Sequence, residues 1–157
     1  MTNKSAIFPG SFDPFTAGHK SVVERALPLF DKIIIAVGDN IFKNTLLSLD
    51  KRITIIKKVF AANPKIEVVS YSGLTVEFAK KNNCGFILRG LRTSADFEFE
   101  RAIGQTNKLL NDEIETVFIL TKPEHTFISS SIVRDVFKNN GDLTQFLPEG
   151  ISRKDLE

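Results

Sequence analysis

The residues best suited to phosphate chemistry lie in one stretch near the start of the chain. Residues 8–20 read FPGSFDPFTAGHK and connect a short apolar run to a helix-like pattern. Gly10 permits a tight turn, Ser11 supplies a hydroxyl, and Gly18 permits close approach of a ligand to the backbone. His19 supplies a ring N–H and, when protonated, a positive charge, near a helix start whose unpaired N–H groups favour an anion. The stretch is a candidate phosphate site, and a strand-to-helix turn capped by the histidine is the alternative.

Cationic and hydroxyl side chains follow other apolar runs of the chain. Arg89 and Arg92 flank a glycine in the sequence RGLR, which suits an anion clamp because a guanidinium can bind phosphate through two hydrogen bonds. Lys43 follows an earlier run, and the hydroxyls of residues 129–131 precede a helix-like pattern, where they also suit an anion. Each residue alone also fits a plainer role, as a solvated cation or a helix cap.

Glu100 is a candidate partner for the sugar or base of a nucleotide. The helix pattern around it has an apolar stripe that is predicted to face the core. The members of the stripe are Ala95, Phe99, Ala102, Ile103 and Leu110. This stripe leaves Glu98 and Glu100 off the core face, where Glu100 could accept a hydrogen bond from a ribose hydroxyl or an adenine amine. A solvated helix face is the alternative.

Short β-branched runs alternate with helix-like patterns along the chain, which is typical of an α/β protein. The runs cover residues 6–8, 33–37, 66–69, 86–88 and 116–120. Helix patterns with one apolar face lie at 22–30, 53–60, 95–110 and 132–137. We therefore predict a doubly wound parallel five-stranded sheet, Rossmann-like, in one domain that covers residues 1–157.

Local signals refine the ends of these elements. Pro28 predicts a kink or an early end of the first helix, because proline lacks the N–H that a helix interior needs. Gly141 predicts a stop after the last apolar helix pattern. The tail at residues 152–157 is polar, so we expect a frayed end.

Parallel sheets of this kind bind ligands at the carboxyl ends of their strands. The candidate cations and hydroxyls follow predicted strands, so we expect them at one edge of the sheet. Such a set suits a nucleoside triphosphate and a second phosphate. The sequence offers no Cys or Ser nucleophile beside a base, no metal-ligand cluster and no carboxylate pair. This favours direct displacement at phosphorus, catalysed by positioning and charge.

Composition narrows the class of protein. A net charge of +2 is too small to indicate nucleic acid or an anionic membrane as a partner. The densest apolar stretch, residues 33–37, is far shorter than the roughly 20 residues of a membrane span. One cysteine, Cys84, excludes an internal disulfide and fits a reducing compartment. With no signal peptide visible, we expect a cytoplasmic protein.

The motifs resemble those of a known superfamily. Thr16–His19 (TAGH) is similar to the T/H-x-G-H signature of the nucleotidyltransferases, and Ile128–Ser131 (ISSS) to their I-S-S-T/S signature. Within that superfamily, residues 88–92 (LRGLR), 96–100 (DFEFE) and 146–148 (FLP) resemble the bacterial phosphopantetheine adenylyltransferases. The likeness runs from residue 5 to residue 148 and implies the nucleotidyltransferase variant of the Rossmann-like fold.

The resemblance implies an activity. ATP and 4′-phosphopantetheine would give dephospho-coenzyme A and pyrophosphate, by direct attack of the 4′-phosphate on the α-phosphorus. It also implies Mg²⁺ carried with ATP, a homohexamer, and inhibition by coenzyme A. The alternatives are a nucleotidyltransferase acting on another phosphorylated acceptor, such as nicotinate mononucleotide or glycerol phosphate, and a regulatory domain that only binds nucleotide.

The resemblance also assigns roles by position. The implied catalytic residues are His19, which stabilises charge in the transition state, Lys43 and Arg92. The implied acceptor-binding residues are Ser11, Lys43, Thr75 and Arg89. The implied ATP-binding residues are Ser11, Phe12, His19, Gly90, Leu91, Arg92, Glu100, His125, Thr126, Phe127, Ile128, Ser129, Ser130 and Ser131. His125 stands where the family usually has Trp or Tyr, and no residue is implied as a metal ligand.

Overall fold

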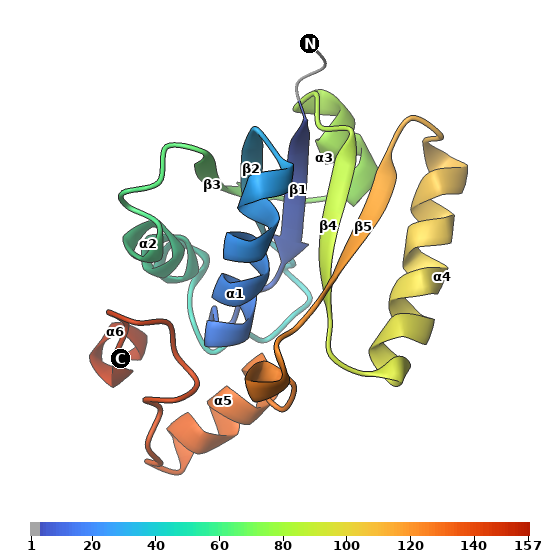
Figure 1. Cartoon of the computed structure of the whole chain (residues 1–157). Coiled ribbons are helices and arrows are strands. Elements are labelled where there is room, and N and C mark those ends of the chain that lie inside the picture. Colours follow the sequence, from blue (N-terminus) through green and yellow to red (C-terminus); the bar gives the residue numbers. More distant parts are fainter. Residues whose placement is uncertain (1–3) are drawn as a thin grey trace.

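Five parallel strands form the central sheet, in the order β3–β2–β1–β4–β5 (Figure 1). The structure, a computed structural model, describes residues 4–157. The strands are β1 (Ser5–Gly10), β2 (Lys32–Gly38), β3 (Ile66–Tyr71), β4 (Phe86–Leu91) and β5 (Glu115–Leu120). Neighbouring strands pair in parallel throughout the sheet. The predicted doubly wound parallel sheet is therefore confirmed, and each predicted apolar run lies within a strand.

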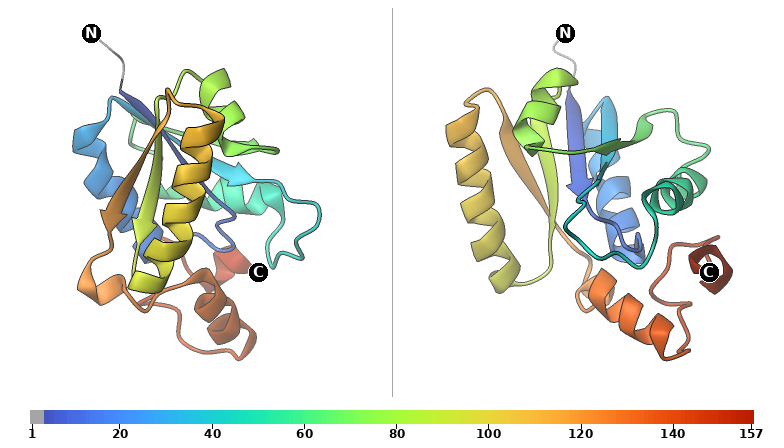
Figure 2. Two further views of the ribbon diagram at one scale, coloured as in Figure 1. Left: turned by 90° about the vertical axis from the view of Figure 1, so that its right-hand side faces the viewer. Right: turned by 180° about the vertical axis from the view of Figure 1, so that it is seen from behind.

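Helices cover both faces of the sheet, and Figure 2 shows α1 and α4 on opposite sides of it. The helices are α1 (Ala17–Ala26), α2 (Leu49–Val59), α3 (Thr75–Lys81), α4 (Ser94–Leu110), α5 (Ser130–Lys138) and α6 (Arg153–Leu156), with short 3₁₀ turns η1 (Leu27–Leu29) and η2 (Pro123–His125). The four predicted helix patterns correspond to α1, α2, α4 and α5. Helices α3 and α6 are too short to give a clear apolar period, and the pattern did not predict them.

Strand β2 shows why the central strands are almost continuously apolar. Successive side chains of a strand point to opposite faces of the sheet. Ile33 and Ile35 pack in the cluster that contains α1 and α2, whereas Ile34 packs in the cluster that contains α3. Both faces are covered, so both sets of positions must be apolar.

The strand order places a ligand site at the carboxyl ends of β1 and β4. From β1 the chain winds outward through β2 and β3, and then returns to β4 on the other side of β1. At this switch point the connections leave in opposite directions, which opens a crevice between them. The loop after β1 and the end of β4 both lie at this crevice.

Helix α4 faces the sheet through a different stripe from the predicted one. Phe99, which we expected in the core, is 68% exposed, and Glu100 is buried, with 8% exposure. A Cβ atom added to Gly104 would lie 3.3 Å from the Thr116 hydroxyl of β5, so this side of the helix approaches the sheet closely. The prediction that Glu100 lies off the buried face is therefore wrong, because the apolar stripe of α4 points away from its own sheet.

Other local predictions have mixed outcomes. Helix α1 ends at Ala26 and continues as the 3₁₀ turn that contains Pro28, so the predicted early end is confirmed. Helix α5 ends before Gly141, whose N–H donates to the Val136 carbonyl at 2.8 Å, but the positive φ (58°) belongs to Asn140. The expected frayed tail is wrong, because α6 buries Leu156. Among residues 4–157, no helix is both long and apolar enough to cross a membrane.

Candidate active site

Two adjoining cavities lie at the predicted edge of the sheet. The first, of about 360 Å³, lies between the loop after β1, the end of β4, the start of α4 and the start of α5. The second, of about 820 Å³, lies beside it against the loops after β2 and β3 and the inner side of α4. Both cavities are lined by Pro9, Gly10, Ser11, Arg89 and Glu100. These shared residues separate two spaces that are each large enough for a small ligand.

His19 is held by a reciprocal cap at the start of α1. The Thr16 backbone N–H donates to Nδ1 of His19 at 3.0 Å, and the His19 backbone N–H donates to the Thr16 hydroxyl at 3.3 Å. A backbone amide can only donate, so Nδ1 carries no proton and the ring proton of neutral His19 lies on Nε2. The ring lines the first cavity.

Phenylalanine rings surround the His19 imidazole. Its centroid lies 5.1 Å from that of Phe12, 5.3 Å from that of Phe15 and 6.3 Å from that of Phe8. Burial, together with the nearby positive charges of Arg92 and Arg89, lowers the pKa of His19 from 6.5 to about 3. His19 is therefore a neutral donor at physiological pH, without the positive charge that the sequence suggested.

Phe12 contributes to the site as a buried residue that packs against His19. Its side chain is buried, and its backbone has a positive φ of 49°, which is unusual for a bulky residue. A Cβ atom at Gly10 would lie 2.8 Å from the Phe12 ring. Glycine is therefore required at position 10 so that Phe12 can pack between the end of β1 and His19.

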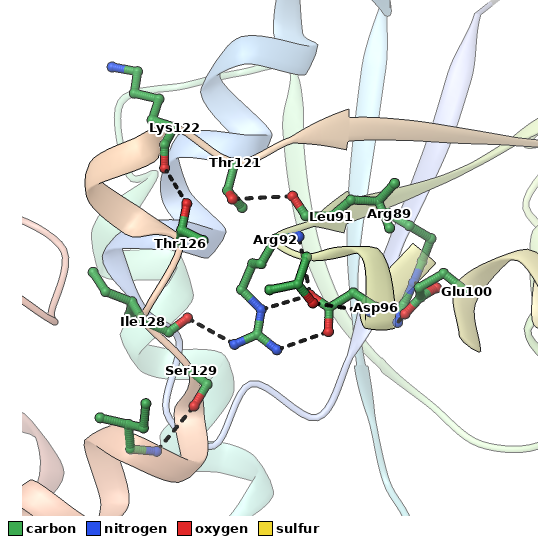
Figure 3. A network of polar contacts seen from close by, with 12 residues as sticks. Arg89, Leu91, Arg92, Asp96, Glu100, Thr121, Lys122, Thr126, Ile128 and Ser129 are labelled. Carbon is green, nitrogen blue, oxygen red and sulfur yellow. Dashed lines mark hydrogen bonds and ion pairs between the residues drawn. The ribbon is translucent and has the colours of Figure 1, made fainter. Parts of the chain in front are cut away.

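Arg89 is fixed at the partition between the cavities. Its Nε and Nη2 atoms donate to the two carboxylate oxygens of Glu100 at 2.8 and 2.6 Å, and Nη1 donates to the Pro9 carbonyl at 2.8 Å (Figure 3 shows the Glu100 contact). The paired hydrogen bonds fix the plane of the guanidinium. Glu100, which was assigned to a ribose or adenine contact, has its carboxylate occupied by Arg89.

Arg92 crosses from the end of β4 to the start of α5 (Figure 3). Its Nε donates to Asp96 at 3.0 Å, and its Nη1 donates to the Ile128 carbonyl at 3.2 Å. The Thr121 hydroxyl donates to the carbonyl of Leu91 at 3.2 Å, so the ends of β4 and β5 are joined beside it. Arg92 and Gly90 line the first cavity, whereas Leu91 is buried and does not.

Ser11 and Lys43 are in contact in the lining of the second cavity. The Lys43 ammonium donates to the Ser11 hydroxyl at 3.1 Å, although the residues are far apart in the sequence. Buried Arg52 donates to the Ser11 carbonyl at 2.7 Å and to the Gly38 carbonyl at 3.1 Å. Thr75 also lines this cavity, at the first position of α3. The predicted acceptor-binding residues Ser11, Lys43, Thr75 and Arg89 are thus brought together.

The predicted segment 125–131 divides into two parts. Residues 128–131 line the first cavity, and Ser129 caps α5 by accepting from the Ile132 N–H. His125, Thr126 and Phe127 do not line either cavity. Phe127 is largely exposed and its ring packs against that of Phe146, whereas His125 lies next to Gly18. The structure therefore supports a cavity-lining role only for the second half of the segment.

Comparisons with known proteins show the family to which the chain belongs. Residues 7–136 match the family model described as Cytidylyltransferase-like. A phosphopantetheine adenylyltransferase of Flavobacterium psychrophilum is 52% identical over 151 residues, which cover 96% of this chain and 99% of the relative. One of Cytophaga hutchinsonii is 51% identical, with 93% and 97% covered. The chain belongs to the phosphopantetheine adenylyltransferase family.

A solved structure supports the fold assignment of this family member. The chain superposes with a TM-score of 0.71 on the crystal structure of a proposed nicotinate-nucleotide adenylyltransferase from Vibrio parahaemolyticus, with 99% of each chain covered. The two sequences are 19% identical, so this likeness concerns the fold alone. The family that the motifs indicated is confirmed by the relatives that are about 50% identical over more than 90% of both chains.

Sequence reasoning missed four charged residues at the site of this family member. Asp96 and Arg134 line the first cavity, Arg52 holds the Ser11 backbone, and buried Asp13 accepts the N–H groups of Leu46 and Leu47 at 2.8 Å. Arg134 donates to the Asp13 carbonyl at 2.8 Å and to Ser131 at 3.0 Å. A signal existed for Arg52, because a charged residue lies beside Ile53 and Ile56 on the apolar side of α2.

The carboxylates around the cavities have protein partners. Within residues 4–157 there is no group of three or more His, Cys, Asp or Glu side chains that could hold a metal. Asp13 accepts backbone N–H groups, Asp96 binds Arg92, and Glu100 binds Arg89. This donor set fits a cation that arrives with its own phosphate and water ligands, and it does not fit a cage built from carboxylates.

Proposed function

We propose that the protein transfers the adenylyl group of ATP to 4′-phosphopantetheine, which yields dephospho-coenzyme A and pyrophosphate. The observation that carries this proposal is that Ser11 and Arg89 line both of two adjoining cavities. A reaction that joins two substrates through one phosphorus atom needs such shared residues at the meeting point. Membership of the family supports the choice of substrates.

The geometry suits direct displacement. An oxygen of the acceptor's 4′-phosphate attacks the α-phosphorus of ATP, and the bond from that phosphorus to the β-bridging oxygen breaks, so pyrophosphate leaves with the electron pair. The attacking oxygen of an ionised phosphate carries no proton, so the step needs no general base. Lys43 and Arg89 would hold the acceptor's phosphate, and Arg92 with residues 128–131 would hold the nucleotide.

His19 would act by donating a hydrogen bond from Nε2 to an α-phosphate oxygen. Its Nδ1 is engaged by the Thr16 N–H, so the free ring N–H is the only polar group that the imidazole offers to the cavity. A fixed donor that meets developing charge typically lowers the barrier by about 3–4 kcal/mol. This role needs no positive charge on His19, because the neutral ring already carries its proton on Nε2.

Mg²⁺ belongs to this proposal as a companion of ATP. When bound, it would neutralise charge on the phosphate oxygens. The residues of this chain would hold the complex through Arg92, Arg134 and the hydroxyls of residues 129–131, which all line the first cavity.

The proposal also covers assembly and regulation. Phe99 and Leu110 of the apolar stripe of α4 are exposed, and neighbouring Leu109 is 87% exposed, which suits burial against further copies in a homohexamer. Coenzyme A carries the parts of both substrates and would compete for both cavities. A cytoplasmic location fits the buried free thiol of Cys84. Light scattering of the purified protein tests the assembly.

Pyrophosphate release tests the substrate assignment. Mg-ATP is mixed with 4′-phosphopantetheine, nicotinate mononucleotide or glycerol phosphate in parallel reactions. The proposal expects turnover only with 4′-phosphopantetheine. Turnover with another acceptor would change the substrate, and tight ATP binding without turnover on any acceptor would favour a regulatory domain.

A further inference from the structure

Two carboxylates of α4 lie one helical turn apart and each holds one of the arginines at the cavities. Asp96 and Glu100 are at positions i and i+4, so their side chains lie on the same side of the helix. Asp96 binds Arg92, and Glu100 binds Arg89 (Figure 3). Both carboxylates are on the side of α4 that approaches the sheet.

The contacts of the two arginines follow one pattern. In each, Nε and Nη2 donate to the carboxylate, at 2.8 and 2.6 Å for Arg89 and at 3.0 and 3.4 Å for Arg92. In each, Nη1 donates to a backbone carbonyl, that of Pro9 for Arg89 and that of Ile128 for Arg92. Each guanidinium is thus anchored at the same three nitrogens by a carboxylate and a fixed strand or loop end.

This anchoring leaves donors for a ligand. A guanidinium has five N–H groups, and three of them are used in each arginine, so one on Nη1 and one on Nη2 stay available. A fork whose plane is already fixed loses less conformational entropy when it binds phosphate. The carboxylates therefore orient the arginines without occupying all of their donors.

We propose that Asp96 and Glu100 are a matched pair of positioning residues, each dedicated to one substrate. Glu100 orients Arg89 for the phosphate of the acceptor, and Asp96 orients Arg92 for the phosphates of ATP. The division by substrate rests on the proposed function, in which Arg89 binds the acceptor and Arg92 the nucleotide. The sequence suggested that Glu100 contacts the sugar or base of the nucleotide. In this proposal Glu100 acts instead through Arg89.

The cavity walls agree with this division. Glu100 and Arg89 line both cavities, at the partition where the acceptor's phosphate would meet ATP. Asp96 and Arg92 line only the first. Loss of Glu100 is expected to have the larger effect, because its carboxylate is nearly buried, whereas the Arg92–Asp96 pair is more open to solvent.

The test compares Glu100→Gln, Asp96→Asn and Glu98→Gln. All three remove one negative charge from the same helix, and exposed Glu98 pairs with Arg101, away from the cavities. Binding of Mg-ATP and of 4′-phosphopantetheine is measured separately by calorimetry, and KM for each substrate is measured in turnover. Circular dichroism verifies that each variant is folded.

We expect each of the two cavity substitutions to weaken the binding of a different substrate. E100Q weakens acceptor binding about tenfold and leaves ATP binding nearly unchanged. D96N weakens ATP binding about threefold and leaves acceptor binding nearly unchanged. E98Q changes neither. If E100Q does not fold, D96N still tests whether a carboxylate of α4 orients its arginine, here Arg92, for one substrate only.

Other patterns overturn the inference. Tighter binding in E100Q and D96N would mean that the carboxylates compete with phosphate for the arginines. Equal effects of all three substitutions would mean a general effect of charge, and a change of ATP affinity alone in E100Q would restore a direct contact with the nucleotide. Failure of the wild-type protein to bind 4′-phosphopantetheine would instead contradict the proposed function, and the ATP arm would still decide the role of Asp96.

Discussion

His19 and Thr16 cap each other at the start of α1, and this contact determines which nitrogen of His19 faces the cavity. The Thr16 N–H occupies Nδ1 at 3.0 Å, so the ring presents Nε2–H to a ligand. The same pair of hydrogen bonds forms a capping box, which satisfies the N–H groups of Thr16 and His19 at the helix start. The signature T-x-G-H therefore combines a helix cap with a hydrogen-bond donor of fixed direction.

Substitution of His19 separates these two roles. His19→Gln keeps a side-chain acceptor at a capping-box position but removes the ring N–H, whereas His19→Ala removes both. We expect kcat to fall about 10²–10³-fold in both variants. Only the alanine variant should also lose about 1 kcal/mol of folding free energy, through the weakened cap. Steady-state kinetics and urea unfolding measure the two effects, and near-normal kcat in either variant would remove His19 from the mechanism.

The lowered pKa of His19 predicts a dependence of stability on pH. The pKa is about 3 in the folded protein and 6.5 in the unfolded chain, so the unfolded chain binds the proton more readily. The free energy of unfolding should therefore fall as pH drops through 6.5 toward 4, by up to about 1.4 kcal/mol per pH unit from this residue.

Chemical denaturation at several pH values checks this dependence, with His19→Gln as the matched control. The control should show a flatter decline between pH 6.5 and pH 4. Identical declines in the two proteins would mean that His19 titrates normally. The ring ¹⁵N shifts should report protonated Nε2 and bare Nδ1 across the same range, and only His125 gives a second set of signals.

Gly18→Ala should affect the ligand and not the fold. A Cβ atom at Gly18 would lie 3.6 Å from the nearest protein atom, an ordinary contact, and the residue lines the first cavity. Replacing glycine by alanine within a helix typically stabilises it by up to about 1 kcal/mol. We therefore expect a higher melting temperature together with weaker Mg-ATP binding by calorimetry. Unchanged ATP affinity would show that the nucleotide does not approach the start of α1.

Substitution of Arg89 should lower the free energy of unfolding much more than substitution of Lys43. Both substitutions, Arg89→Ala and Lys43→Met, are expected to raise KM for 4′-phosphopantetheine. Arg89→Ala also leaves the carboxylate of Glu100 buried without its partner, which typically costs about 3–5 kcal/mol. Lys43→Met should change the free energy of unfolding by less than about 0.5 kcal/mol, because its hydrogen bond to Ser11 is exposed. A rise in KM for ATP alone in either variant would reverse the assignment of the phosphate sites.

The sheet and the position of the site could be predicted from the sequence. Strands such as Ile33–Val37 are apolar at every position, which only a sheet covered on both faces requires, and parallel strands bring their carboxyl ends to one edge. Ser11, Lys43 and Arg89 were therefore expected at the same edge; all three line the second cavity, and Lys43 donates a hydrogen bond to Ser11.

The orientation of α4 could not be predicted in the same way. A helical period shows that one stripe is apolar, but it does not show whether that stripe faces the sheet of its own chain. Phe99 is exposed and Glu100 is buried because the carboxylate meets Arg89. The lowered pKa of His19 could not be predicted from the sequence either. It depends on burial among phenylalanine rings that only the folded loop after β1 brings together.

The most direct test that the acceptor's phosphate attacks the α-phosphorus of ATP follows the oxygen atoms of that phosphate. 4′-Phosphopantetheine carrying ¹⁸O at every non-bridging phosphate oxygen is incubated with Mg-ATP, and the products are weighed by mass spectrometry. Attack of this phosphate on the α-phosphorus predicts that dephospho-coenzyme A retains all of the label and that pyrophosphate contains none. Label in pyrophosphate, or the absence of dephospho-coenzyme A, would contradict the account.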